Sequence, residues 1–283
     1  MTAVIIDGRA IAAELREDLK AQVAVLRARG VAPHLAVAVL GDDPAARSYV
    51  RAIERAAAAV DAVCTVHRLP GTAGADDLGA LLDTLGADSS SVHGIIVQTP
   101  LPAGLDIATI GAHIRVEKDV DGLNPTSAGR LALGLPSYAP ATAAAVMEAV
   151  HRAEIGLRGA RAVVIGRSAV VGKPVALLLL REDATVTLCH SRTVDLPAVA
   201  READLLVVAV GRARMVGADY VRPGAVVIDV GINEVEGKTV GDIDYEPVAE
   251  IAGAITPVPG GIGPLTNVML LRNTIQAAQT TIG

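Results

Sequence analysis

A glycine-containing segment in the second half of the chain has the composition of a phosphate-binding loop. Residues 166–174 read Gly-Arg-Ser-Ala-Val-Val-Gly-Lys-Pro; they follow the apolar stretch 161–165 and lead into an apolar helical pattern. Glycine lets a backbone approach a phosphate closely, and a helix amino terminus offers unpaired N–H groups and the positive end of its dipole. The spacing differs from G-x-G-x-x-G, so an ordinary strand–turn–helix connection would also use these glycines.

The residues after the next apolar stretch indicate which dinucleotide such a loop would hold. NAD-binding proteins usually carry an acidic residue there, which accepts a hydrogen bond from the ribose 2′-hydroxyl. Here the stretch 185–189 is followed by His190-Ser191-Arg192-Thr193, without a carboxylate. Arg167 and Arg192 would accommodate a 2′-phosphate, so the sequence favours NADP, with NAD the less favoured cofactor. Two solvated surface arginines are the alternative interpretation.

These segments belong to an alternating series of predicted strands and helices, which is typical of parallel sheets covered by helices. The first half predicts helices over 9–29, 44–59 and 76–85 and strands over 35–40, 63–69 and 94–98. The second half predicts helices over 142–152, 172–181, 195–202 and 265–280 and strands over 161–165, 185–189, 205–210 and 225–230. The second series has the order that a dinucleotide-binding domain requires.

The segment 117–140 is rich in turn-forming residues and is predicted to be loop and hinge. We therefore predict an α/β protein of two domains with a cleft between them. Residues 1–139, joined by a final helix over 265–283, form an α/β substrate domain. Residues 140–264 form a Rossmann-like, parallel-sheet dinucleotide-binding domain.

The composition excludes several classes of protein. A chain of 283 residues that is 51% hydrophobic can bury two cores. A net charge of −6 offers no broad positive field for nucleic acid. Two cysteines give neither a disulfide framework nor zinc-ligand spacing, so we expect no metal and a reducing, cytoplasmic setting. No apolar run approaches the roughly 18 to 20 residues of a membrane span, so we expect no membrane association.

Seven segments, in one order along nearly the whole chain, resemble the bifunctional methylenetetrahydrofolate dehydrogenase/methenyltetrahydrofolate cyclohydrolase family. They are GDDPAARSYV (41–50), GIIVQTPLP (94–102), EKDVDGLNP (117–125), VVIGRSAVVGKP (163–174), ATVTLCHSRT (184–193), GAVVIDVGIN (224–233) and ITPVPGGIGPLT (255–266). The resemblance implies NADP-dependent oxidation of 5,10-methylenetetrahydrofolate to 5,10-methenyltetrahydrofolate. It also implies that one-carbon derivatives of tetrahydrofolate are the ligands and that the enzyme is a homodimer.

The resemblance also implies the site residues. Tyr49 would border the pterin and aminobenzoyl groups, Gln98 would hydrogen-bond in the reaction zone, and Asp121 would accept from the pterin's donor edge. A turn of Pro259, Gly260 and Gly261 would let the backbone pass close to the folate. The implied cofactor contacts are Thr142, Gly166, Arg167, Ser168, Gly172, Pro174, Ser191, Arg192 and Ile232, with Thr142 also a helix cap. Without the resemblance, Asp121 could instead be an Asx-type loop cap and 259–261 a simple turn.

The chain departs from the family where a lysine stands four residues after the tyrosine, because that position is Ile53. Cyclohydrolase chemistry removes a proton from water that attacks the methenyl carbon, and isoleucine cannot take a proton. Hydride transfer depends mainly on the positioning of two bound molecules. We therefore expect dehydrogenase activity with weak or absent cyclohydrolase activity. The loop 140–145, Pro-Ala-Thr-Ala-Ala-Ala, also departs from the family's pattern.

The sequence is also compatible with three other functions. The protein could be fully bifunctional and produce 10-formyltetrahydrofolate, with Lys118 or a bound water in place of the missing lysine. It could be a non-catalytic folate- or nucleotide-binding paralogue. It could also be a two-domain dehydrogenase of another small acid, for which only His190 and His113 are candidate catalytic groups.

Overall fold

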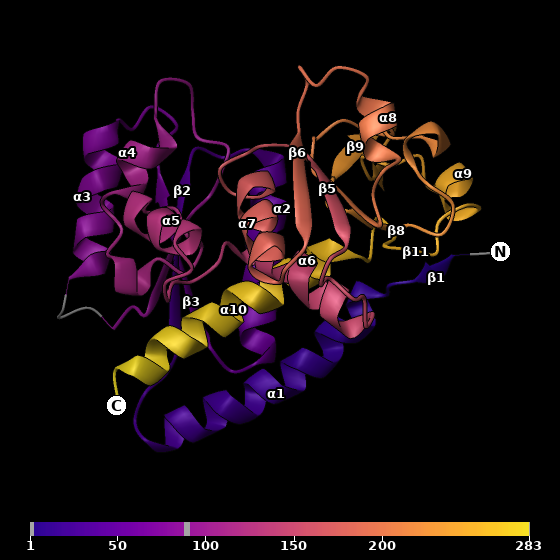
Figure 1. Ribbon diagram of the computed structural model, residues 1–283. Coiled ribbons are helices and arrows are strands. Elements are labelled where there is room, and N and C mark those ends of the chain that lie inside the picture. Colours follow the sequence, from indigo (N-terminus) through magenta and orange to yellow (C-terminus); the bar gives the residue numbers. More distant parts are fainter. Residues whose placement is uncertain (1–2, 88–90, 283) are drawn as a thin grey trace. The chain divides into compact units, whose positions relative to one another are not determined.

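A computed structural model of the chain describes residues 3–87 and 91–282 and divides into two compact units (Figure 1). Unit 1 comprises Thr142–Thr266 together with the described residues up to Ala13. Unit 2 comprises Glu14–Ala141 and the residues from Asn267 onward, within the described ranges. Each unit contains a parallel sheet with helices, so the predicted α/β class is confirmed.

Unit 1 is built on a six-stranded sheet in which every pairing is parallel. Its strand order is β1 (Val4–Ile5), β11 (Ala254–Ile255), β8 (Val226–Asp229), β7 (Leu205–Val208), β5 (Arg161–Ile165) and β6 (Thr185–Cys189). All four residues of β7 are fully buried. Continuous apolar runs of this kind are expected where a parallel strand is covered on both faces.

The remaining elements of unit 1 connect these strands. They are α6 (Ala141–Arg152), α7 (Gly172–Arg181), α8 (Leu196–Ala200), the 3₁₀ turn η2 (Ala218–Tyr220), the antiparallel hairpin β9 (Asn233–Val235) and β10 (Lys238–Val240), and α9 (Tyr245–Ala249). Helix α7 links β5 to its neighbour β6, which places the loop 166–171 at the carboxyl end of β5. That end is where parallel α/β sheets bind ligands.

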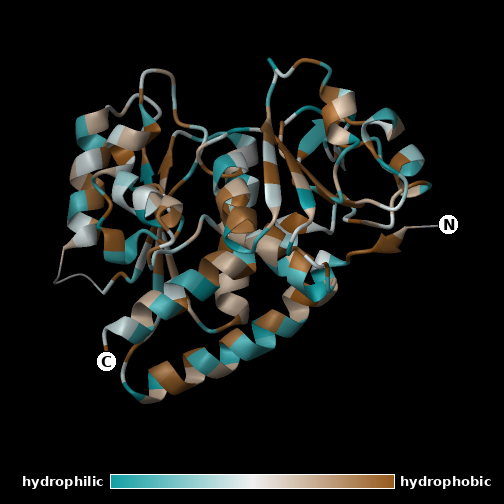
Figure 2. Cartoon of the chain, in the orientation of Figure 1, coloured by the Kyte–Doolittle hydropathy of each residue, from teal (hydrophilic) through white to brown (hydrophobic). Residues whose placement is uncertain are grey.

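Unit 2 is built on a three-stranded parallel sheet ordered β3 (Val63–Leu69), β2 (His34–Leu40) and β4 (Gly94–Val97). Its helical elements are α1 (Gly8–Ala28), α2 (Pro44–Ala59), α3 (Ala75–Gly86), α4 (Ile107–Gly111), η1 (Val116–Lys118), α5 (Pro125–Ala132) and α10 (Ile262–Thr280); both α1 and α10 begin in unit 1. Hydrophilic and hydrophobic residues alternate along α1 (Figure 2), as expected for a helix with one face on a core. None of the helices in the described ranges is long and apolar enough to span a membrane.

Helix α2 carries the two residues on which the functional question depends, and its start is fixed by local chemistry. The Asp43 carboxylate accepts a hydrogen bond from Ala46 N at 2.9 Å, and Pro44 occupies the first helical position. Both features are favoured at a helix amino terminus. The helix therefore presents Tyr49 and Ile53, four residues apart, along one face.

Two differences from the sequence expectation bear on the domains and on the segment between them. The segment 117–140 was expected to be loop, but it contains α5, which begins because Asn124 Oδ1 accepts from Thr126 N at 2.6 Å and Pro125 follows as the first helical residue. Residues 3–13, predicted within the first domain, cluster instead with unit 1. The reason is that β1 pairs with β11, close to the far end of the chain.

Candidate active site

Gln98 and Asp121 lie together at the carboxyl edge of the sheet of unit 2. Gln98 directly follows β4, and its backbone N–H donates to Ala38 O at 2.9 Å. Ile95 forms a parallel bridge with Asp119, so the segment 119–121 runs beside β4 in the same direction. Two residues further along each segment, Asp121 is level with the end of β4, immediately before Gln98.

The Asp121 carboxylate is half-buried and holds the start of α6. Its Oδ1 accepts a hydrogen bond from Ala141 N at 2.8 Å. Burial raises the pKa of Asp121 to about 6; the hydrogen bond from Ala141 opposes this effect and the nearby Asp119 adds to it. The loop itself is capped by Asp119, which accepts from Leu123 N at 2.8 Å and Asn124 N at 2.9 Å. Asp121 therefore keeps acceptor capacity beyond its bond to Ala141.

Tyr49 shares surroundings with Asp121. Burial, and secondly the charge of Asp121, raise the pKa of the Tyr49 phenol above its ordinary value. The phenol stays protonated at neutral pH and can act as a hydrogen-bond donor. Its ring is half-buried in the surface of unit 2, which suits contact with a flat, partly apolar ligand.

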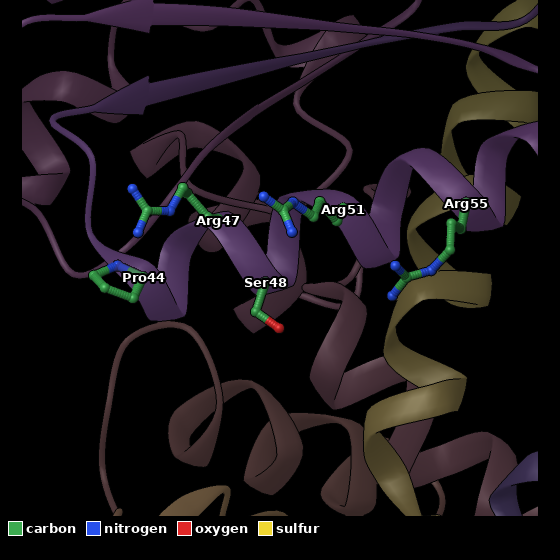
Figure 3. Close-up of a pocket in the computed structure, with 5 residues that line it drawn as sticks. All are labelled: Pro44, Arg47, Ser48, Arg51 and Arg55. Carbon is green, nitrogen blue, oxygen red and sulfur yellow. The ribbon is translucent and has the colours of Figure 1, made fainter.

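Ile53, one turn further along α2, is a core residue with 1% of its surface exposed. The nearby Arg51 and Arg55 are exposed and line a separate hollow with Pro44, Arg47 and Ser48 (Figure 3). Neither Tyr49 nor Ile53 is among the residues that line it. The two arginines therefore do not stand in for an amine at position 53.

Lys118 is directed away from this edge. Its ammonium group donates to Leu85 O at 3.4 Å and Ala87 O at 3.1 Å, at the carboxyl end of α3. Lys118 also acts electrostatically on His93, which immediately precedes β4. Lys118 thus lies toward the amino edge of the sheet, whereas Gln98 and Asp121 follow the carboxyl ends.

The Gln98 side chain is incompletely satisfied in the folded chain. Its Nε2 donates to Thr99 O at 2.8 Å, whereas its Oε1 is buried and has no hydrogen-bond partner. Buried acceptors are paired in the great majority of cases, so an unpaired one at a strand end is an available ligand contact.

The loop after β5 in unit 1 requires glycine at two positions. Gly166 has φ +126°, and a Cβ there would lie 2.1 Å from Ala209 O. A Cβ on Gly172 would lie 2.0 Å from Gly166 O. The Ser168 hydroxyl accepts from Val171 N at 3.2 Å and Gly172 N at 3.3 Å, which orders the start of α7. Pro174 is buried in the first turn of that helix.

Two arginines emerge beside this loop. Cys189 at the end of β6 is paired with Ile165 at the end of β5, so the residues that follow each strand share one edge of the sheet. Arg167, Ser168, Ser191 and Arg192 are all exposed there. The turn after β6 is held by His190 N–H donating to Thr193 Oγ1 at 2.9 Å and Arg192 N–H donating to His190 Nδ1 at 3.1 Å. A glycine loop, a helix amino terminus and two exposed guanidinium groups fit a dinucleotide with a 2′-phosphate.

The predicted turn 259–261 lines a pocket in unit 1. Gly260 has φ +117°, and Gly261 N donates to Pro257 O at 2.7 Å, which closes the turn tightly. The same pocket is lined by Ile232, which is 67% exposed, and by Arg9 and Asp229. Thr142 is the second residue of α6 and so lies inside the helix rather than at the predicted cap. The bond to the start of this helix comes from Asp121 instead.

The sequence did not identify a pair of buried carboxylates that orders the strand-end loops of unit 1. Asp242 is fully buried and accepts from the backbone N–H groups of Val210, Gly211 and Arg212 at 2.6 to 2.9 Å, as well as from Asn233 Nδ2 at 2.9 Å. It thereby ties the loop after β7 to the start of β9. Burial raises the pKa of its neighbour Asp229 to about 6. No local sequence signal marks this network, because its donors come from three separate segments.

Comparison with known proteins accounts for both units. The model of the tetrahydrofolate dehydrogenase/cyclohydrolase catalytic domain matches residues 6–121, and the model of the NAD(P)-binding domain of the same family matches residues 140–282. The chain belongs to this family. The resemblance seen in the sequence is therefore confirmed, and so is a dinucleotide-binding domain in the second half of the chain. A dehydrogenase of another small acid is no longer needed to explain the architecture.

Individual relatives of this family match over nearly their full length. The "Bifunctional protein FolD" of Parafrankia sp. is 61% identical over 274 residues, covering 97% of this chain and 98% of the relative. The bifunctional FolD structure from Campylobacter jejuni has a TM-score of 0.96 at 42% identity and 99% coverage of both chains. The Trypanosoma brucei enzyme, complexed with NADP cofactor and an inhibitor, has a TM-score of 0.94 at 37% identity, covering 100% of this chain and 99% of that one. In the described part of this chain, no group of three or more His, Cys, Asp or Glu residues is placed to hold a metal ion.

Proposed function

We propose that this protein oxidises 5,10-methylenetetrahydrofolate to 5,10-methenyltetrahydrofolate with NADP, and that its cyclohydrolase activity is weak or absent. The dehydrogenase assignment rests on family membership together with the residues of both sites. The observation that carries the second half of the proposal is Ile53, an apolar side chain that is 1% exposed one turn after Tyr49. The relatives from Parafrankia sp. and Campylobacter jejuni are named bifunctional, so the proposed weak or absent cyclohydrolase activity would distinguish this chain from them.

In this proposal unit 2 supplies the side chains that bind the folate. Asp121, which is mostly ionised at neutral pH with a pKa of about 6, accepts hydrogen bonds from the donor edge of the pterin. The protonated phenol of Tyr49 borders the ring, and the unpaired Gln98 Oε1 faces the reaction zone. A carboxylate for paired donors and an aromatic surface for a flat ring are the groups that such a ligand needs.

Unit 1 holds the cofactor in this proposal. Bound NADP would supply the hydride acceptor. Gly166, Ser168 and Gly172 form the loop against which the pyrophosphate would lie, and the amino terminus of α7 stabilises its charge. Arg167 and Arg192 bind the 2′-phosphate in preference to a bare ribose. The remaining proposed contacts are Thr142, Pro174, Ser191 and Ile232, with Pro259, Gly260 and Gly261 reserved for the folate.

The dehydrogenase step needs little proton handling by the chain. As hydride leaves the methylene carbon, the adjacent nitrogen lone pair forms an amidinium, so positioning supplies most of the catalysis. Hydrolysis of the methenyl product is different, because water must lose a proton as it attacks. Ile53 cannot accept that proton, Arg51 and Arg55 line another hollow, and the Lys118 ammonium is bonded to carbonyls of 85 and 87.

Two other functions are compatible with the fold. A fully bifunctional enzyme producing 10-formyltetrahydrofolate is favoured by the names of the relatives and would need water or another group to carry the proton. A non-catalytic folate- or nucleotide-binding paralogue would explain the loss at position 53, but the presence of Tyr49, Gln98 and Asp121 argues against it. The homodimer and the cytoplasmic setting expected from the sequence are part of this proposal as well.

The test is a dehydrogenase assay on the purified protein with 5,10-methylenetetrahydrofolate, comparing NADP with NAD at equal concentrations. We expect rapid NADPH formation and a higher kcat/KM with NADP. Binding of both ligands without reduction of either dinucleotide would support the non-catalytic paralogue instead. The decay of the methenyl product is followed in the same samples. Decay that is accelerated by the enzyme would support the fully bifunctional alternative.

A further inference from the structure

The unpaired buried side-chain oxygens of the described residues gather in one unit. Among the described residues, three buried side-chain atoms have no hydrogen-bond partner, namely Gln98 Oε1, Ser137 Oγ and Asn267 Oδ1. All three belong to unit 2, the unit that also carries Tyr49 and Asp121. A buried acceptor without a partner costs free energy in the free protein, so each one calls for an explanation, and pairing with a bound ligand is one. Asn267 is not among the residues to which the proposed function assigns a ligand contact.

The contacts of α10 place Asn267 along the sheet. Thr274 faces the start of β4, since a Cβ on Gly94 would lie 2.8 Å from Thr274 Oγ1. Asn273 Nδ2 donates to Val120 O at 2.8 Å, one residue before Asp121. Asn267 is seven residues before Thr274, which is two helical turns, so both side chains point from the same side of α10.

The direction of α10 decides which edge of the sheet Asn267 approaches. At the carboxyl end of the helix, Gln279 Nε2 donates to Gln22 Oε1 at 3.2 Å, and Arg29 donates to Ile282 O at 3.2 Å, beside the last turns of α1 (Figure 1). Arg27 in turn donates to Asp61 O at 2.9 Å, just before β3 begins. The carboxyl end of α10 therefore lies toward the amino edge of the sheet, and its earlier turns run toward the carboxyl edge.

Asn267 lies on the part of α10 that runs toward the carboxyl edge. Seven helical residues rise about 10 Å, so Asn267 is displaced by about that length along the helix from the contact between Thr274 and Gly94. Because the carboxyl end of α10 lies at the amino edge, this displacement takes Asn267 toward the edge that carries Gln98 and Asp121. The amides of Gln98 and Asn267 bring two unpaired acceptors to one edge, beside a carboxylate of raised pKa.

We propose that Asn267 is a further substrate-binding residue, whose amide oxygen accepts a hydrogen bond from the bound folate. This inference rests on the proposed function, because it assigns an additional contact to the same folate site. An amide oxygen left unpaired in the free protein and paired in the complex makes its whole contribution on binding. An apolar residue at position 267 would stabilise the free chain and weaken the complex.

The test uses the full-length protein and 5-formyltetrahydrofolate, a stable tetrahydrofolate, as the probe. Calorimetry gives its Kd and that of NADP for wild type and for Asn267→Leu, which keeps the size of the side chain and removes its polarity. We expect the Kd for the folate to rise about 5- to 10-fold, as for the loss of one neutral hydrogen bond. We expect the Kd for NADP to change less than 2-fold and Tm to rise by roughly 2–4 °C.

Two further variants make the result specific. Asn267→Asp keeps an acceptor and should hold the folate Kd within about 3-fold of wild type. Gln279→Leu changes an amide at the other end of α10 and should leave both Kd values unchanged. An unchanged folate Kd in Asn267→Leu, or an equal weakening of NADP, would overturn the inference. Wild type that binds no folate would overturn the proposed function as well, so the two failures are distinguishable.

Discussion

Ile53 lies one helical turn after Tyr49 on α2, yet the two side chains differ sharply in exposure. Tyr49 is half-buried beside Asp121, whereas Ile53 is 1% exposed and belongs to the core of unit 2. A side chain at position 53 could contact a ligand beside Tyr49 only if it were long enough to extend out of the core. Isoleucine is short and also has no group that can accept a proton. The proposed division between the two activities follows from this relationship.

Ile53→Lys should add cyclohydrolase activity. The surroundings that bury isoleucine would lower the pKa of the introduced amine toward neutrality, which suits a general base. We expect methenyltetrahydrofolate hydrolysis to rise by about 10²-fold, the lower end of general-base contributions, with Tm lowered by burial of the amine. Ile53→Met keeps the site apolar and should leave hydrolysis at the wild-type rate. A folded, dehydrogenase-active Ile53→Lys with no gain in hydrolysis would contradict the assigned role.

Folate binding should weaken as the pH falls through about 6. The pKa of Asp121 is raised to about 6. Only the ionised carboxylate can accept hydrogen bonds from the pterin N–H groups with both oxygens, because protonation turns one oxygen into a donor. Because the folded pKa exceeds the ordinary 3.8, ionisation of Asp121 lowers the folding stability as the pH rises from about 4 to about 6. Asp121→Asn should remove the pH dependence of the folate Kd near pH 6 and weaken binding throughout. Titrations from pH 5 to 8 measure both effects, and a wild-type Kd that is flat over this range would argue against the role of Asp121.

Gly166→Ala should abolish NADP binding. Its Cβ would lie 2.1 Å from Ala209 O, at a φ of +126° that side chains rarely adopt, so the loop must move away from the position that admits a phosphate. Gly159→Ala is the matched control, since φ there is +76° and no atom lies within 4 Å of the added Cβ. The control should lose about 1 kcal/mol of folding free energy from strain alone and keep its NADP affinity. Equal NADP affinity in both variants would show that the loop 166–171 does not bind the cofactor.

Arg192→Ala should change the choice between dinucleotides. Loss of a charge-assisted bond to the 2′-phosphate corresponds to about 1.5–3 kcal/mol, or roughly 10- to 100-fold in KM for NADP. The KM for NAD should change little. Arg181→Ala, at the opposite end of α7, should affect neither value. Steady-state kinetics with both cofactors measure the preference for NADP over NAD. If wild type and variant show the same preference, Arg192 is a solvated side chain that does not bind the cofactor.

The strands were predictable from sequence where burial is continuous. The run 161–165 has the bounds that the sequence predicts, because four of its five residues are apolar and buried. The edge strand 185–189 also has the predicted bounds, although three of its five residues are exposed. The two residues of β1 were missed, since such a short strand is defined only by its partner β11. Helix α5 was missed because Asn124 and Pro125 favour turns as well as helix starts.

The site residues could be predicted in part, from family motifs and not from patterns of buried residues. Tyr49, Gln98 and Asp121 came from a resemblance between motifs, and the structure brings them together within unit 2. The burial of Ile53 and the diversion of Lys118 to carbonyls of 85 and 87 are tertiary facts without a local signal. The same is true of the Asp242 network and of the unpaired oxygen of Asn267.

The loss of cyclohydrolase activity is measured most directly as the rate at which purified wild-type protein hydrolyses 5,10-methenyltetrahydrofolate, taken beside its rate of NADP reduction with 5,10-methylenetetrahydrofolate. We predict rapid NADPH formation while the methenyl compound decays no faster than in buffer without protein. Decay that is accelerated in proportion to enzyme concentration, at a rate comparable to NADP reduction, would contradict this prediction.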